Sequence, residues 1–159
     1  MKNEKYFSMK AIMPHRPPML LIDRVCSYDV ENQSLIAEFD IKEGSMFFDA
    51  TLGGVHSWAG IEYMAQAMAA LTGILGLEGR GENPKIGFIL GTRKYSNEIG
   101  HYCVGKTYTV EVGALFHDDS IGSFKCEIRE PDGAVCATAG INAFSPEDVE
   151  AFLLSGANG

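Results

Sequence analysis

Positive charge is scarce in this sequence. Its 13 lysines and arginines are outnumbered by 21 aspartates and glutamates, so the formal net charge at pH 7 is −8. Proteins bind polyanions largely by neutralising phosphates with basic side chains, and this balance offers little of that. We therefore expect no nucleic-acid partner. A local basic patch could still form, and its candidate residues are Arg80, Lys85, Arg93 and Lys94.

Long uninterrupted apolar runs are also missing. No segment reaches the roughly 18 apolar residues that a membrane-spanning helix needs. Residues 1–23 contain lysines but no sustained apolar run that closes on small residues, as a signal peptide would have. We expect a cytoplasmic protein without a membrane span. A chain of 159 residues fits a single domain, covering residues 1–159.

Closely spaced cysteines are the third absence. The four cysteines show no Cys-x-x-Cys spacing, and three of them fall in segments that resemble strands. Small buried hydrophobic residues explain them better than disulfides or metal ligands do. We expect neither a metal nor a cofactor.

Segments rich in β-forming residues surround one long apolar helix. The predicted strands are residues 20–25, 34–41, 85–91, 107–116, 123–130 and 134–144. The turn sequences HDDSIG and PDGA indicate hairpins between the last three strands. Ser145 followed by a proline predicts the start of a short terminal helix.

The helix predicted from Ser57 to about Leu75 is apolar on nearly every face. Such a helix must be buried on most sides, and a curved antiparallel sheet can cover it. Ser57 is a good N-cap residue. Glycines at 60 and 73 cost roughly 1 kcal/mol each in a helix, so we expect close approach of a neighbour to compensate. The predicted fold is α+β, a curved antiparallel sheet of about six strands wrapped around one long central helix.

Two polar residues interrupt this helix. Glu62 and Gln66 lie four residues apart and share a face. This face could simply touch water, or Glu62 could line an enclosed cleft that favours its protonated form and makes it a proton donor. His56 stands at the helix start and could act as a base or merely pack there. The free amides of Ser57, Trp58 and Gly60 could bind a thioester carbonyl oxygen.

Three motifs resemble the β-hydroxyacyl-acyl-carrier-protein dehydratases, which have the hotdog fold. The motifs are PHRPPMLLIDRV, IEYMAQAMAALTGIL and IGFILGTRKYSNEIGHYCVGKTYTVEV, and together the resemblance covers most of residues 10–145. It implies that Glu62 is the catalytic acid and that Gln66 supports it. It places His15 in the N-terminal segment and outside the catalytic pair, so we interpret His15 as structural.

One departure from the family pattern concerns the catalytic histidine. The family carries it in a Gly-His-Phe-Pro-Gly element before the helix, and an ungapped count from Glu62 reaches Phe48 at that place. His56 is the histidine available in this loop. The sequence is more similar to a divergent branch, the dehydratase-like proteins of aryl-polyene biosynthesis clusters, which shows Pro-His-Arg-Pro-Pro-Met-Leu-Leu and Glu-x-Met-Ala-Gln.

The resemblance implies dehydration of 3-hydroxyacyl thioesters in fatty-acid-like or polyene biosynthesis. The substrate carrier would be an acyl carrier protein or coenzyme A, and the assembly a homodimer or a heterodimer with a homologue. His56 would be the base and Glu62 the acid, if necessary across two subunits. Two alternatives stay open at this point. They are an acyl thioesterase on the same fold and a non-catalytic subunit of a dehydratase heterodimer.

Overall fold

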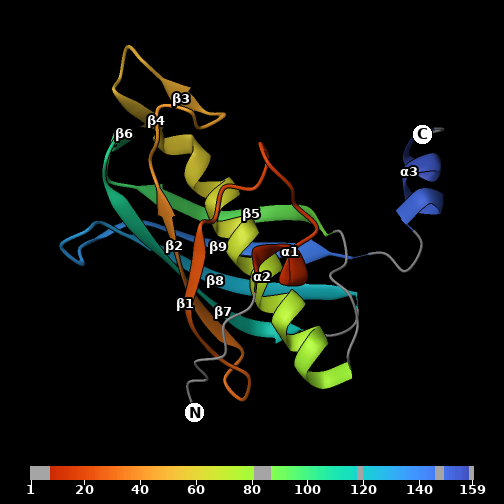
Figure 1. The fold of residues 1–159 in the computed structure, drawn as a ribbon. Helices are drawn as coiled ribbons and strands as arrows, with labels where there is room; N and C mark the ends of the chain where they lie inside the picture. The colour runs from red at the N-terminus through yellow and green to blue at the C-terminus, as the bar shows by residue number, and fades with distance from the viewer. Residues whose placement is uncertain (1–7, 81–86, 118–119, 146–148, 158–159) are drawn as a thin grey trace.

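One long helix lies across the concave face of a six-stranded antiparallel sheet (Figure 1). The computed structural model describes residues 8–80, 87–117, 120–145 and 149–157. The sheet has the strand order β1-β2-β7-β8-β9-β5. Its strands are β1 (Arg24–Asp29), β2 (Ser34–Asp40), β5 (Phe88–Asn97), β7 (Thr107–His117), β8 (Ile121–Arg129) and β9 (Val135–Phe144). The arrangement confirms the α+β architecture predicted from the sequence.

The central helix, α2, spans Gly60–Arg80 and is preceded by a 3-10 turn, η1 (Ser57–Ala59). It is longer than predicted at its C-terminal end. The prediction of Ser57 as the N-cap is wrong, because Ser57 lies inside the 3-10 turn and His56 occupies the cap position without a side-chain cap bond.

Two glycines let neighbours approach α2 closely. A Cβ at Gly73 would collide with the backbone of Ile12 in a short helix, α1 (Met9–Ile12). A Cβ at Gly60 would lie 2.5 Å from the hydroxyl of Tyr102 and 2.6 Å from that of Tyr95. Close approach therefore does compensate for the low helix propensity of glycine at both positions.

Aromatic rings fill the core between α2 and the sheet. Phe39 stacks on Tyr63 with ring centroids 3.7 Å apart, and Tyr102 packs edge-on against both rings. Tyr108 completes the group from β7. All four side chains are buried, so they fix the start of α2 against β2 and β7.

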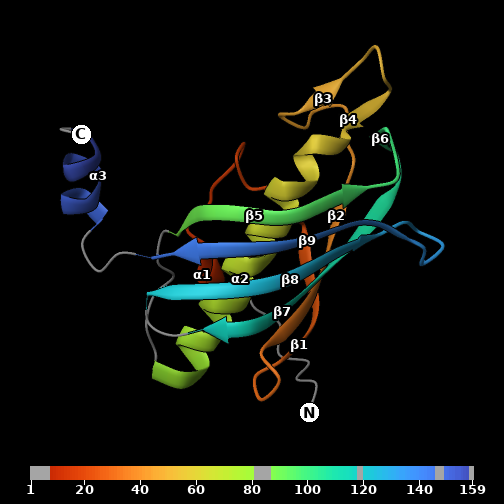
Figure 2. The same cartoon turned by 180° about the vertical axis from the view of Figure 1, so that it is seen from behind.

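A second, small sheet caps the N-terminal end of α2 (Figures 1 and 2). It has the order β3-β4-β6, with β3 (Phe48–Asp49), β4 (Gly54–His56) and β6 (His101–Cys103). Neither this sheet nor α1 is among the elements predicted from the sequence. Strands of two or three residues are too short to show a hydrophobic period.

The strand predicted at residues 20–25 begins only at Arg24. The preceding amides of Leu21 and Ile22 are bonded to the side chain of Gln66 instead of to a neighbouring strand. β5 runs further than predicted, to Asn97, and carries a bulge between Arg93 and Ser96.

The C-terminal helix, α3 (Val149–Ala157), stands away from the sheet (Figures 1 and 2). The predicted start at Ser145 cannot be followed into the helix, because residues 146–148 lie outside the described part of the chain; the amide of Ser145 itself donates to the carbonyl of Ser120 at 2.7 Å. Within the described residues, no helix combines the length and the apolar character needed to cross a bilayer.

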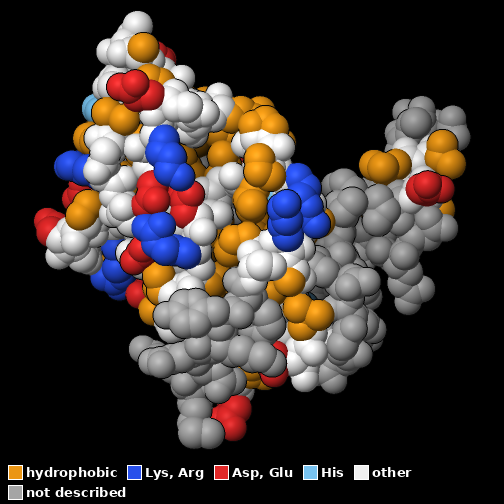
Figure 3. Space-filling view, viewed as in Figure 1, with side chains coloured by type: hydrophobic (Ala, Val, Ile, Leu, Met, Phe, Trp, Pro, Cys, Tyr) orange, Lys and Arg blue, Asp and Glu red, His pale blue; other side chains and the backbone are white. Residues whose placement is uncertain are grey.

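The outer face of β1 and β2 carries interleaved acidic and basic side chains (Figure 3). Arg24 bonds Glu38 at 2.6 Å and Asp40 at 2.7 Å, and Lys42 bonds Asp23 at 2.8 Å. Asp23 and Arg24 belong to the motif that suggested the dehydratase family. In this structure they join the first two strands.

Candidate active site

Gln66 links the central helix to the N-terminal segment. Its side chain is fully buried. Oε1 accepts hydrogen bonds from the amides of Leu21 at 2.7 Å and Ile22 at 3.4 Å, and Nε2 donates to the carbonyl of Met19 at 2.7 Å. This amide therefore holds the segment that follows Pro-His-Arg-Pro-Pro against the first turns of α2. These bonds give Gln66 a structural role, and its supporting role in catalysis stays a prediction.

Glu62 lies one turn before Gln66 on the same face of α2. Nε2 of Gln66 donates a hydrogen bond of 3.0 Å to Oε1 of Glu62. The Glu62 side chain is partly buried in the isolated chain. A buried amide thus fixes the direction of the carboxyl group, and Glu62 is neither free in water nor paired with a cation among the described residues.

His15 lies close enough to Glu62 to respond to its charge. Burial lowers the pKa of the His15 ring, and the negative charge of Glu62 opposes that effect. Nδ1 of His15 is buried and has no hydrogen-bond partner among the described residues. This proximity is not evident from the sequence, because the Pro-His-Arg segment is held against α2 by contacts between residues far apart in the chain.

His56 is held in a different place, at the end of β4. Its Nε2 lies 3.0 Å from Oδ2 of Asp49, and its ring stacks on Trp58 with centroids 6.0 Å apart. Among the described contacts, none joins His56 to Glu62 within the chain. Asp49 could not be predicted from the sequence, because its position depends on the short β3–β4 hairpin.

The backbone amides at the start of α2 are partly occupied. The amide of Ser57 donates to the carbonyl of Gly100 at 3.2 Å, and the amide of Gly60 donates to the carbonyl of Ser57. The hydroxyl of Tyr95 also donates to that carbonyl, at 2.6 Å. These bonds do not favour Ser57 and Gly60 as donors to a thioester. The amide of Trp58 stays the better candidate for that role.

The remaining predicted residues show no common site. Arg93 and Lys94 are exposed on β5. Lys85 and the side chain of Arg80 lie outside the described part of the structure. Cys126 and Cys136 are buried as expected, but Cys26 is exposed and Cys103 half-buried, so the interpretation of all four as core residues is wrong. All four thiols are unpaired. Among described residues, no three His, Cys, Asp or Glu side chains form a metal-ligand set.

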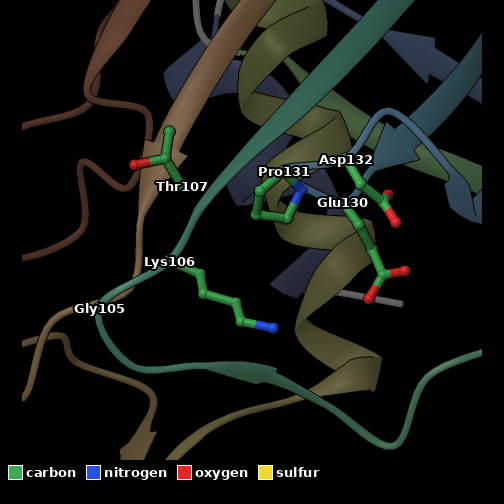
Figure 4. Close-up of a pocket in the computed structure, with 6 residues that line it drawn as sticks. All are labelled: Gly105, Lys106, Thr107, Glu130, Pro131 and Asp132. Carbon is green, nitrogen blue, oxygen red and sulfur yellow. The ribbon is translucent and has the colours of Figure 1, made fainter.

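An open hollow of about 380 Å³ lies between the β6–β7 turn and the β8–β9 hairpin (Figure 4). It is lined by Gly105, Lys106, Thr107, Glu130, Pro131 and Asp132. Lys106 and Asp132 are exposed and Glu130 is half-buried, and neither Glu62 nor His56 lines the hollow. We assign no catalytic role to this hollow.

The sequence and the fold match a known family of proteins. The family model described as ApeP-like, ApeP dehydratase, matches residues 7–154. The chain therefore belongs to the ApeP-like dehydratase family, as the sequence motifs indicated.

Curated relatives are 3-hydroxyacyl-[acyl-carrier-protein] dehydratases named FabZ. Those of Chlamydia trachomatis and Chlamydia caviae are each 35% identical over 86 residues, which is 52% of this chain. The chain spans about 55% of the length of the first of these relatives and 54% of the second.

Solved structures confirm the hotdog fold. The dehydratase heterocomplex ApeI:P from Xenorhabdus doucetiae matches with a TM-score of 0.84 and 26% identity, covering 94% of this chain and 98% of that one. A hypothetical thioesterase from Streptococcus pneumoniae, with coenzyme A, gives a TM-score of 0.58 at 10% identity, covering 77% and 84%. The PaaI protein of E. coli gives 0.58 at 12% identity, covering 79% of each chain. At such identities the last two show the fold alone.

Proposed function

We propose that this chain takes part in the dehydration of 3-hydroxyacyl groups carried on an acyl carrier protein, with Glu62 as the proton donor. The observation that carries this proposal is the Glu62–Gln66 pair on a buried helix, tied by Gln66 to the Pro-His-Arg segment. The names of the family and of the curated relatives support the same reaction.

The reaction needs an acid and a base on a thioester substrate. A base removes the C2 proton, and the C–H electrons form the C2–C3 double bond. The C3–O bond breaks, and the hydroxyl leaves as water with a proton from the carboxyl group of Glu62. The amide of Trp58, just before α2, is the candidate donor that stabilises the negative charge on the thioester oxygen.

We further propose that the working assembly contains a second hotdog subunit. Among the described contacts none joins Glu62 and His56 within the chain, which supports an acid–base pair completed across two subunits. The structural relative from Xenorhabdus doucetiae is a heterocomplex, which supports a homologue as the partner. The free outer edge of β5 supports the same view, because β5 ends the six-stranded sheet in the described structure.

The test replaces Glu62 with Gln, which keeps the size of the side chain and its bond to Gln66 but removes the acid. Enoyl and free thiol products are both measured with a 3-hydroxyacyl carrier substrate. We expect the variant to lose about 100-fold or more in kcat. Unchanged enoyl formation would remove Glu62 from the mechanism. If the wild-type protein released free thiol without forming an enoyl product, the chain would be assigned to thioester hydrolysis.

The compartment, pathway and carrier are parts of the same proposal. Four unpaired thiols suit a reducing cytoplasm. Membership of the ApeP-like family supports a place in aryl-polyene biosynthesis.

Exposed Arg93 and Lys94 could attract an acidic carrier protein to β5. Reversing both charges should then slow turnover of the carrier-bound substrate while leaving that of the coenzyme A thioester unchanged.

A further inference from the structure

Asp49 and His56 form a pair on one face of the small sheet. Asp49 lies directly opposite Gly54 in the β3–β4 ladder, and His56 is two residues further along β4. Because side chains two residues apart point to the same face of a strand, the carboxylate and the imidazole share one side of this sheet. Their contact, 3.0 Å from Oδ2 to Nε2, joins two strands that are otherwise very short.

The carboxylate of Asp49 is itself fixed in direction. Its other oxygen, Oδ1, accepts hydrogen bonds from the hydroxyl of Thr51 at 2.6 Å and from the Thr51 amide at 2.9 Å. The bond from the Thr51 hydroxyl, followed by that from His56, lowers the pKa of Asp49 below its ordinary value. At neutral pH Asp49 is therefore ionised and can only accept hydrogen bonds.

Because the ionised Asp49 carboxylate can only accept hydrogen bonds, it determines which nitrogen of His56 carries the proton. In the neutral ring, Nε2 must hold the hydrogen that it donates to Asp49, so Nδ1 keeps its lone pair. Among the described residues, Nδ1 has no hydrogen-bond partner. The ring is also held by stacking on Trp58, and the side chain of His56 is 41% exposed, so a substrate can reach it.

We propose that Asp49 is a positioning residue that fixes His56 as the Nε2–H tautomer, so that Nδ1 is the base that removes the C2 proton. This inference rests on the proposed dehydratase function. Nδ1 takes the proton, the C–H electron pair becomes the new double bond, and the hydroxyl leaves as water with the proton of a Glu62 carboxyl. The imidazolium formed is stabilised by the adjacent Asp49 carboxylate.

The groups around His56 belong to all three strands of the small sheet. His101 of β6 lies opposite His56 in the ladder, and its Nε2 contacts Sγ of Cys103 at 3.7 Å. His101 is thus directed toward Cys103, while His56 is directed toward Asp49. Each histidine therefore has its own partner. His56 is paired with the Asp49 carboxylate, and His101 is paired with the Cys103 thiol.

The experiment compares four variants in the assembly that turns substrate over. They are Asp49→Ala, His56→Ala, the double variant, and Asp29→Ala as a matched control. Asp29 also orders a turn by accepting a backbone amide bond, from Asn32 at 3.0 Å, but it lies in the β1–β2 hairpin. We expect kcat to fall about 100-fold or more for His56→Ala and about 10-fold or more for Asp49→Ala.

The kcat of the double variant distinguishes a positioning role of Asp49 from a merely structural one. If Asp49 acts through His56, the double variant is no slower than His56→Ala, and Asp29→Ala keeps wild-type kcat. Nitrogen NMR of the His56 ring should show the Nε2–H tautomer in the wild type and a mixture in Asp49→Ala. Two results would overturn this inference and leave the proposed function intact. In the first, the kcat losses of Asp49→Ala and His56→Ala multiply in the double variant. In the second, His56→Ala keeps the wild-type rate while Glu62→Gln is inactive. A wild-type assembly that forms no enoyl product would overturn both.

Discussion

At the residue scale, Gln66 uses both ends of its amide to connect distant parts of the chain. It accepts from Leu21 and donates to Met19 and Glu62. The sequence could indicate the Glu62–Gln66 pair, because a spacing of four residues defines a shared helix face. It could not indicate that His15 lies near Glu62 or that Asp49 binds His56, since those contacts depend on loop paths without a periodic pattern.

Replacing Gln66 with Leu tests this connection. The amide of Leu21 and the carbonyl of Met19 would be left without their partner, so we expect a loss of about 1–3 kcal/mol in the free energy of unfolding. Enoyl formation should fall as well, because Glu62 loses its hydrogen bond. Thr72→Val is the control on the same helix, since Thr72 bonds only the nearby Ala69 carbonyl in the described contacts. Equal stability of the two variants in a urea titration would contradict this role of Gln66.

Asp40 makes a pH-dependent contribution to stability. Hydrogen bonds from Arg24 and then Thr107 lower the pKa of Asp40 from 3.8 to about 2. Its stabilising effect is therefore complete above pH 3.8 and is lost as the pH falls through about 2. Asp40→Asn should lower the free energy of unfolding near neutral pH by about 1 kcal/mol after solvent screening.

Unfolding curves of wild type and Asp40→Asn at several pH values would measure that effect. The gap between the two proteins should stay constant above pH 3.8 and narrow below it. A gap that stayed constant throughout the acid range would show that the charge of Asp40 contributes nothing to folding stability.

At the element scale, the pattern of apolar residues predicted the long helix and four of the six main strands in nearly their correct places, and of β5 it predicted only the beginning. The first strand was predicted too early in the chain. Leu21 and Ile22 are apolar like strand residues, but their amides bond to the side chain of Gln66. The small β3-β4-β6 sheet, which carries Asp49 and His56, was missed. The candidate residues Glu62, Gln66 and His56 could therefore be named from the sequence, whereas Asp49 and its contact with His56 could not.

The contact between α1 and α2 gives a test at this scale. Alanine normally stabilises a helix relative to glycine by about 1 kcal/mol. At Gly73 the added methyl group would meet the backbone of Ile12, which cannot rotate away. We expect Gly73→Ala to destabilise the protein by about 1–3 kcal/mol. Gly113→Ala, where nothing lies within 4 Å of the new carbon, is the control in thermal unfolding.

At the scale of the whole molecule, the outer edge of β5 is the place where we expect a second subunit. Leu90 is 60% exposed on this strand, and Ile89 is exposed beside it. A charge at the centre of such an interface is costly when it is desolvated. Leu90→Glu should therefore shift the assembly toward monomer, as measured by light scattering. The control is Leu115→Glu, at a position on β7 that is 72% exposed. It should leave the measured mass of the assembly unchanged.

The rate of enoyl thioester formation from a 3-hydroxyacyl carrier substrate, by wild type and Glu62→Gln side by side, tests the central claim most directly. Each protein should be assayed alone and mixed with a homologous hotdog subunit. We predict product from the wild-type mixture and a rate at least about 100-fold lower from the Glu62→Gln mixture. Equal rates from the two mixtures would contradict the assignment of Glu62 as the proton donor.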